Sequence, residues 1–220
     1  AYLETHNANG QTVSIGDPTS MGDGIANNDS VLTARISTIS TLTINNLSIT
    51  DLTGIEDFLS IDELFCNDNL LTILDLSNNL FLTALKCYNN QLISLNLSEN
   101  DSLQQLECGY NQLINLDLVN KTKLQTFNCQ NNQLAGLDLS NSNLLEEVYA
   151  DNNSLTYLYL SDSSVIRGVF ARNSNLDTVN FETLNFIEIV DIYFTNNNFE
   201  KLDLRNVKFA ELYCDSNQLS

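Results

Sequence analysis

Residues 82–97 read Leu82-Thr-Ala-Leu85-Lys-Cys87-Tyr-Asn-Asn90-Gln-Leu92-Ile-Ser-Leu95-Asn-Leu97. The frame Leu-x-x-Leu-x-Cys-x-x-Asn-x-Leu returns 21 residues later, from Leu103 to Leu113. A fixed period of this length is the signature of a solenoid, in which each repeat forms one coil stacked on its neighbours. The cysteines mark the period, at Cys66, Cys87, Cys108 and Cys129.

Each repeat contains two half-motifs. The first holds Leu-x-Cys, and the second holds Leu-x-Leu, as in Leu95-Asn-Leu97. Alternation of apolar and polar residues is typical of a short strand with one buried face. We therefore expect two short strands in each coil, one on each side of a flattened right-handed coil, and a parallel sheet of equivalent strands.

The repeat does not cover the whole chain. Residues 1–38 carry turn signals such as Asn7-Ala-Asn-Gly10 and Gly16-Asp-Pro18, and we interpret them as an N-terminal cap that shields the first coil. Residues 39–220 form the repeat array. The sequence starts without Met and stops inside a repeat, so we expect the last repeat to be truncated and the natural protein to be longer.

Composition limits the possible partners. The chain has 220 residues, with 9 basic and 28 acidic side chains and a net charge of −19. This acidic surface excludes nucleic-acid binding, which needs basic patches, and an anionic membrane would repel it. The sequence contains no apolar stretch of about 20 residues, so it predicts no membrane-spanning segment. The acidity fits high solubility, salt-rich surroundings or cation binding.

The cysteines are predicted to be buried free thiols that fill the core. Equivalent side chains in neighbouring coils run parallel, which does not suit a disulfide torsion near 90°, and a straight row does not supply a tetrahedral zinc site. The same lane continues with Ala150, Ala171 and Phe194 before Cys214. Alanine can replace a core filler but not a metal ligand.

Asparagines also recur with the period. We expect these side chains to hydrogen-bond backbone groups of a neighbouring coil at a bend, where turns leave polar atoms unpaired. The positions are Asn69, Asn90, Asn111, Asn132, Asn153, Asn197 and Asn217, with Ser174 in place of one asparagine.

The frame resembles the leucine-rich repeat family, and more narrowly the short-repeat cell-surface proteins of Bacteroidota, which are similar to internalins. This resemblance covers essentially the whole chain. It implies a non-catalytic, secreted or surface-attached recognition module, often exported by the type IX system, whose partner is an extracellular protein or a glycan. It also implies that the ligand meets the concave sheet built from the first half-motif.

One outward-facing lane of that sheet ends in four consecutive aromatic residues. Rings flanked by polar groups suit a protein partner or a sugar face, whereas cross-strand stacking could simply stabilise the sheet. The predicted ligand-binding residues are Tyr149, Phe170, Tyr193 and Tyr213, with Glu147, Asp151, Arg172 and Asp191 beside them.

Other functions have weaker support. No cofactor is expected; weak calcium candidates are Asp17, Asp23, Asn27 and Asp29 in the cap, and stacked acids on the second sheet, which reads as a solvated face. The single histidine, His6, is remote from the cysteines, and no phosphate-binding glycine loop occurs, so we expect no enzyme. The alternatives are a structural spacer or adhesin arm without a specific ligand, and a polysaccharide lyase or hydrolase.

Overall fold

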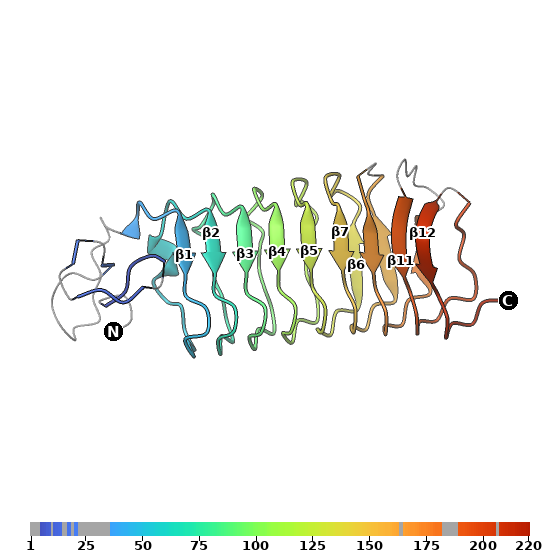
Figure 1. Cartoon of the computed structure of the whole chain (residues 1–220), viewed down its shortest axis with the longest axis horizontal. Coiled ribbons are helices and arrows are strands. Elements are labelled where there is room, and N and C mark those ends of the chain that lie inside the picture. The colour runs from blue at the N-terminus through green and yellow to red at the C-terminus, as the bar shows by residue number, and fades with distance from the viewer. Residues whose placement is uncertain are drawn as a thin grey trace.

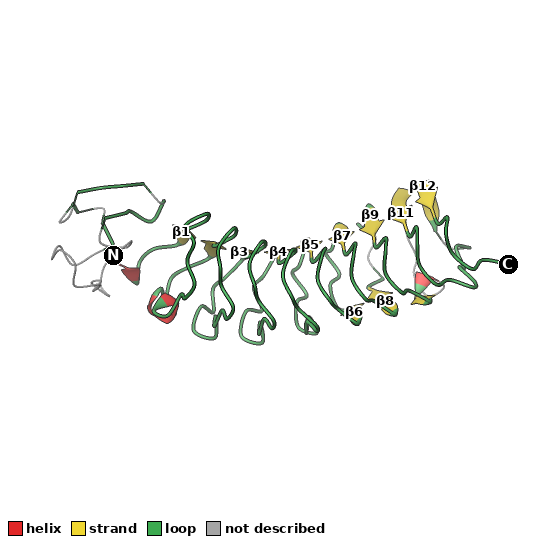
Figure 2. Cartoon of the chain, turned by 90° about the horizontal axis from the view of Figure 1, so that it is seen from below, coloured by secondary structure: helices red, strands yellow, loops and turns green. Residues whose placement is uncertain are grey.

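The chain is an elongated stack of coils in the computed structural model (Figure 1). The structure describes residues 5–9, 11–14, 17–18, 20–21, 36–162, 165–181, 189–205 and 207–220. Each coil adds one strand to a long parallel sheet, and the array bends so that this sheet lies on its inner, concave side (Figure 2). The expected leucine-rich repeat solenoid with coils of about 21 residues is confirmed.

The concave sheet has nine strands in the order β1-β2-β3-β4-β5-β7-β9-β11-β12. Equivalent residues pair from coil to coil, as Leu85 does with Leu106, so the repeat sets the register. The strands are β1 (Thr41–Thr43), β2 (Glu63–Phe65), β3 (Ala84–Lys86), β4 (Gln105–Glu107), β5 (Thr126–Asn128), β7 (Glu147–Tyr149), β9 (Gly168–Phe170), β11 (Ile189–Tyr193) and β12 (Lys208–Tyr213).

The opposite side forms strands only in its C-terminal half. There, β6 (Gly136–Leu139), β8 (Tyr157–Leu160) and β10 (Thr178–Val179) pair in the order β10-β8-β6. In the described N-terminal coils this side has only the isolated bridge between Asp75 and Asn96. The prediction of two strands in each coil is therefore wrong for these coils, because they spread apart on the convex side and their segments there lie too far from one another to form a ladder (Figure 2).

Residues 39–64, which precede the regular repeats, contain a short 3-10 helix, η1 (Ile55–Asp57). Gly54 precedes it with φ of 101°, a left-handed conformation that glycine adopts without steric cost. Ile55 and Phe58 are buried, so this turn closes the core of its coil.

The core is a continuous stack of leucines and cysteines. Cys66, Cys87, Cys108 and Cys129 are buried free thiols, as predicted. Burial raises the pKa of Cys66 and Cys108 to about 12, because a thiolate would be desolvated there. Cys214 is also a free thiol but is only partly buried, which corrects the prediction of five buried thiols. It lies in the last coil, where only one neighbouring coil covers it.

The recurring asparagines, which we name the asparagine lane, hydrogen-bond each coil to the one before it. Asn111 is representative: its Nδ2 donates to the carbonyl oxygens of Cys87 and Cys108 at 3.0 and 3.1 Å, and its Oδ1 accepts from the Leu92 backbone N–H at 3.0 Å. These bonds confirm the predicted scaffolding role. Ser174 is too short to repeat them, and its buried hydroxyl has no hydrogen-bond partner among the described residues.

The N-terminal segment contacts the first coil. Met21 and Ile36 are buried in the same hydrophobic cluster as Leu42. The Thr43 backbone N–H, in β1, also donates to the Ala8 carbonyl oxygen at 3.0 Å. The described parts of this segment thus cover apolar surface of the array.

Candidate functional site

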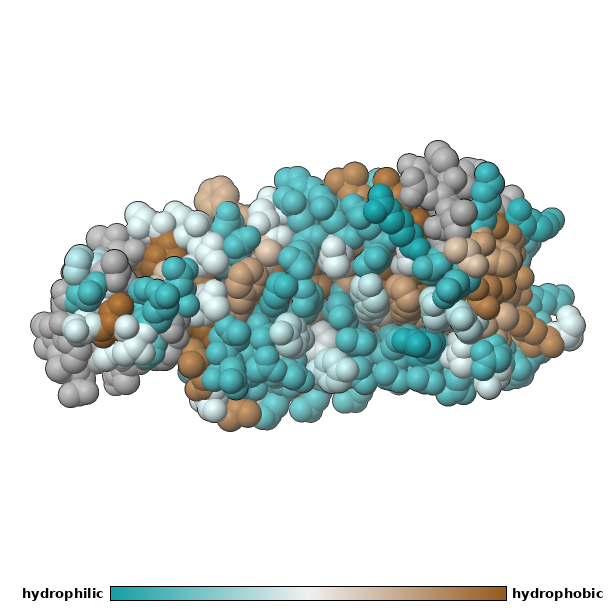
Figure 3. Space-filling model, viewed as in Figure 1, coloured by the Kyte–Doolittle hydropathy of each residue, from teal (hydrophilic) through white to brown (hydrophobic). Residues whose placement is uncertain are grey.

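Four aromatic side chains stack along the C-terminal half of the concave sheet. We name Tyr149, Phe170, Tyr193 and Tyr213 the ring ladder; they come from β7, β9, β11 and β12. Ring centroids lie 4.8 Å apart between Tyr149 and Phe170, 4.9 Å between Phe170 and Tyr193, and 4.8 Å between Tyr193 and Tyr213. This separation matches the spacing of neighbouring strands. Figure 3 shows hydrophobic surface gathered at this C-terminal end of the face.

The rings lean along their strands toward the lane two residues earlier. Gly168 occupies that lane in β9, and a Cβ built on it would lie 2.6 Å from Cε2 of Phe170. The missing side chain is what allows the Phe170 ring to keep its place between the two tyrosines. With both faces of Phe170 covered by stacked rings, the ladder presents mainly ring edges to solvent.

Carboxylates hold the hydroxyl groups of two tyrosines. Tyr149 Oη donates to Oε2 of Glu147 at 2.8 Å, and Tyr193 Oη donates to Oε2 of Glu211. Burial, followed by the hydrogen bond to Glu147, raises the pKa of Tyr149 to about 12. The hydrogen bond to Glu211 is the main cause that raises the pKa of Tyr193 to about 12. Both phenols are therefore neutral donors at neutral pH.

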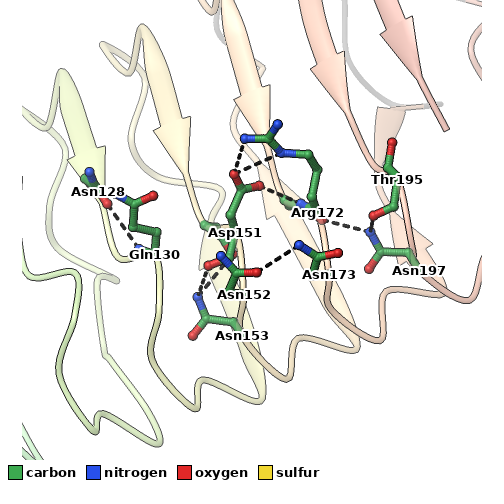
Figure 4. Close-up of polar contacts among 11 residues, drawn as sticks. Asn128, Gln130, Asp151, Asn152, Asn153, Arg172, Asn173, Thr195 and Asn197 are labelled. Carbon is green, nitrogen blue, oxygen red and sulfur yellow. Dashed lines mark hydrogen bonds and ion pairs between the residues drawn. The ribbon is translucent and has the colours of Figure 1, made fainter. Parts of the chain in front are cut away.

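Arg172, which lies beside the ladder, is already paired. Arg172 donates to Asp151 through its backbone N–H at 2.7 Å, Nε at 3.0 Å and Nη2 at 2.6 Å (Figure 4). The Asp151 carboxylate is nearly buried, and its hydrogen bonds raise the pKa of Arg172 further. The guanidinium also lies 5.5 Å from the Tyr193 ring centroid. These contacts fix Arg172 in place and neutralise its charge.

Acidic side chains form a row along one side of the ladder. We name Glu147, Asp191 and Glu211 the acid row; Gly168 lies between its first two members. Asp191 and Glu211 pair directly in register, so two carboxylates are neighbours on adjacent strands. A register shift between Val190 and Asp191, which leaves Ala210 of β12 without a partner in β11, precedes this alignment.

The structure brings the eight predicted ligand-binding residues onto one continuous surface but divides their roles. Asp151 and Arg172 form an internal pair, whereas Glu147 positions a tyrosine. Sequence reasoning left out Glu211 and Gly168. The repeat period predicts that Glu211 lies on the outer face of the sheet beside the rings. It does not predict the hydrogen bond from the Tyr193 hydroxyl, which depends on how the rings lean. Gly168 carries no side chain to mark it.

The acidic lane on the convex side serves local turns. Oδ1 of Asp75 accepts the Ser77 backbone N–H at 3.0 Å, and these hydrogen bonds lower the pKa of Asp75. Asn96, Asp117, Asp138 and Asp203 accept the N–H two residues later in the same way. Within the described residues, no group of three His, Cys, Asp or Glu side chains could hold a metal ion. Of the calcium candidates in the N-terminal segment only Asp17 is described; Asp23, Asn27 and Asp29 lie outside the described residues.

Comparison with known proteins identifies the fold class. No protein family and no curated protein matches the chain. The functional domain of InlJ from Listeria monocytogenes, which includes a cysteine ladder, has a similar structure, with 31% identity and a TM-score of 0.77 over 86% of this chain and 42% of that one. The leucine-rich repeat domain of APL1B shares 21% identity, with a TM-score of 0.70 over 84% and 57%. A chain of the LRIM1/APL1C complex shares 23%, with a TM-score of 0.71 over 86% and 37%.

These similarities establish a leucine-rich repeat solenoid. The chain spans less than two thirds of the length of each of these three proteins. Among the described residues, no helix is both long enough and apolar enough to cross a membrane.

Proposed function

We propose that this chain is a non-catalytic recognition module that binds a protein through the C-terminal half of its concave sheet. The observation that carries the proposal is the ring ladder, a contiguous aromatic surface with a half-exposed Tyr213 at its end. Rigid aromatic side chains give large contact area at low entropy cost and are enriched in interface hot spots. The LRIM1/APL1C complex is an assembly of two proteins, and a chain of it shares this fold.

A protein fits this surface better than a glycan. A sugar ring stacks on an open aromatic face, but the faces of Phe170 are covered by Tyr149 on one side and Tyr193 on the other. Arg172 and Tyr213 likewise flank Tyr193. Outward ring edges form a narrow apolar ridge, against which apolar and aromatic side chains of a protein can pack edge to face.

Features outside the ladder support a location for this module and a division of the chain into two parts. We place the module outside the cell, secreted or attached to the cell surface and acting in adhesion, because its repeat resembles those of bacterial surface proteins. We assign residues 1–38 to an N-terminal cap, which the burial of Met21 and Ile36 supports, and residues 39–220 to the array.

The chemistry of the described residues gives catalysis little support. The thiols in the core lane are buried and their raised pKa keeps them protonated. A spacer that binds nothing remains the rival account, in which the ladder only stabilises the sheet.

A displayed library of random 15-residue peptides distinguishes these accounts. The library is selected against the chain, and the selected peptides are tested on Tyr149→Ala/Tyr193→Ala and on the matched control Tyr157→Ala/Tyr159→Ala from β8, where two half-exposed rings also stack. We expect peptides that lose at least tenfold in affinity with the first variant and none with the second. A selection that yields only peptides insensitive to Tyr149 and Tyr193, or a glycan array with ladder-dependent binding, would overturn the proposal.

A further inference from the structure

The concave face carries carboxylates that form no ion pair with any basic side chain in the described part of the chain. Two basic residues of this face are already paired: Lys86 Nζ lies 2.9 Å from Oε1 of Glu107, and Arg172 is bound to Asp151. Lys208, at the start of β12, is exposed and forms no ion pair with the described carboxylates. The acid row forms no ion pair with any side chain in the described ranges. Its hydrogen bonds come from neutral tyrosine hydroxyls, which leave the carboxylates charged.

The arrangement of these carboxylates is electrostatically unfavourable in the free chain. Like charges placed directly opposite on neighbouring strands destabilise a sheet, and Asp191 and Glu211 are such a pair. Asp215 lies on the other side of the ladder, where its Oδ1 accepts the Thr195 hydroxyl at 2.9 Å. The rings therefore lie between negative charges on both sides.

We propose that the partner presents a basic protein segment, with Lys or Arg side chains flanking apolar ones, to this part of the sheet. This inference rests on the proposed function and specifies the chemistry of its partner. The apolar side chains lie along the ring ladder, while the cations meet the acid row on one side and Asp215 on the other. Complementary charge steers the encounter and relieves the repulsion between Asp191 and Glu211.

The two tyrosine–carboxylate bonds prepare the surface for such a segment. Each hydroxyl is held by one oxygen of Glu147 or Glu211, which fixes the carboxylate beside the ring. The acids are thus ordered before binding, so a Lys or Arg meets a preformed acceptor and less side-chain entropy is lost. Gly168 interrupts the row, so the cations are expected at both ends of the row rather than evenly along it.

Three displayed peptide libraries test the inference on the full chain. All carry the same random apolar positions, and their polar positions are restricted to Lys/Arg, to Ser/Gln or to Asp/Glu. Selected peptides are then measured on Asp191→Asn/Glu211→Gln, which keeps the acceptor for Tyr193 but removes two charges. The control, Asp177→Asn/Glu200→Gln, removes two charges from exposed positions outside the nine-stranded sheet and gives the same net charge.

We expect ladder-dependent binders from the Lys/Arg library, with an affinity loss of at least tenfold for Asp191→Asn/Glu211→Gln and less than twofold for the control. Equal losses for both variants would show only general attraction to an acidic protein and would overturn the inference. Ladder-dependent binders from the Ser/Gln or Asp/Glu library that ignore the acid row would overturn it while leaving the proposed function intact. If no library yields a binder sensitive to Tyr149→Ala/Tyr193→Ala, both fail.

Discussion

The Phe170 ring occupies the space that a side chain at position 168 would need, since a Cβ on Gly168 would lie 2.6 Å from Cε2 of Phe170. This relationship joins a residue without a side chain to the centre of the ring ladder. The ring cannot simply turn away, because Tyr149 and Tyr193 stack on its two faces. Gly168 therefore controls the shape of the candidate surface.

Gly168→Ala should distort the ladder without removing any ring. We expect peptides selected on the wild-type chain to bind at least fivefold more weakly, and the free energy of unfolding to fall by about 1–3 kcal/mol, the usual cost of overpacking. Gly136→Ala is the matched control, because its Cβ would meet the Tyr157 ring at 2.2 Å on the opposite sheet. Titration of both variants checks this; equal binding by Gly168→Ala and wild type would mean that the ladder's shape is irrelevant.

Asn111→Ala should destabilise the array by about 2–4 kcal/mol, because it leaves buried backbone groups of two coils unpaired. The affected groups are the carbonyls of Cys87 and Cys108 and the N–H of Leu92. Urea denaturation measures the loss. Gln112→Ala, at the exposed neighbouring position, should stay within about 0.5 kcal/mol of wild type. A loss below about 1 kcal/mol for Asn111→Ala would contradict the scaffolding role of the lane.

The thiols should differ in reactivity with their burial. A thiol reagent should label five cysteines in denaturant, but in the native chain only Cys214 should react quickly. The other four, Cys66, Cys87, Cys108 and Cys129, are buried and should be protected. Mass spectrometry of labelled peptides identifies the sites. Rapid native labelling of Cys87 or Cys108, or a disulfide between any two, would contradict the packing described for the core.

Stability should fall as pH rises above about 9. The folded chain keeps the thiol protons of Cys66 and Cys108, whose pKa is raised from 9.0 to about 12, while the unfolded chain releases them near 9. The stabilisation that these two buried thiols contribute is therefore complete below pH 9 and is lost between pH 9 and pH 12. For each thiol, the free energy of unfolding falls by about 1.4 kcal/mol for each pH unit in this range. Urea midpoints between pH 8 and 10 measure the slope.

The control for this pH dependence replaces the buried thiols. A variant with Ala at positions 66, 87, 108 and 129, the residue that Ala150 and Ala171 already supply in the lane, should lose most of the slope. An unchanged slope would assign the alkaline instability to other groups, such as Tyr149.

The repeat made much of the fold predictable. The period places Leu85 opposite Leu106 and predicts the core cysteines, because identical coils in register must stack identical residues. It does not reveal the curvature that separates the convex segments of the N-terminal coils, or the partial exposure of Cys214 in the last coil. The row of aromatic residues could be predicted for the same reason as the core, because coils in register stack equivalent positions. The lean of the rings over Gly168 could not, because it depends on side-chain packing between coils.

The most direct test of the central claim compares binding and stability in one variant. Tyr149→Ala/Tyr193→Ala removes two rings and leaves every core residue in place. We predict at least a tenfold loss in affinity for peptides selected on the wild-type chain, with a melting temperature close to that of the control Tyr157→Ala/Tyr159→Ala. Unchanged affinity together with a sharp fall in melting temperature would contradict the account, and would show that the ring ladder only holds the sheet together.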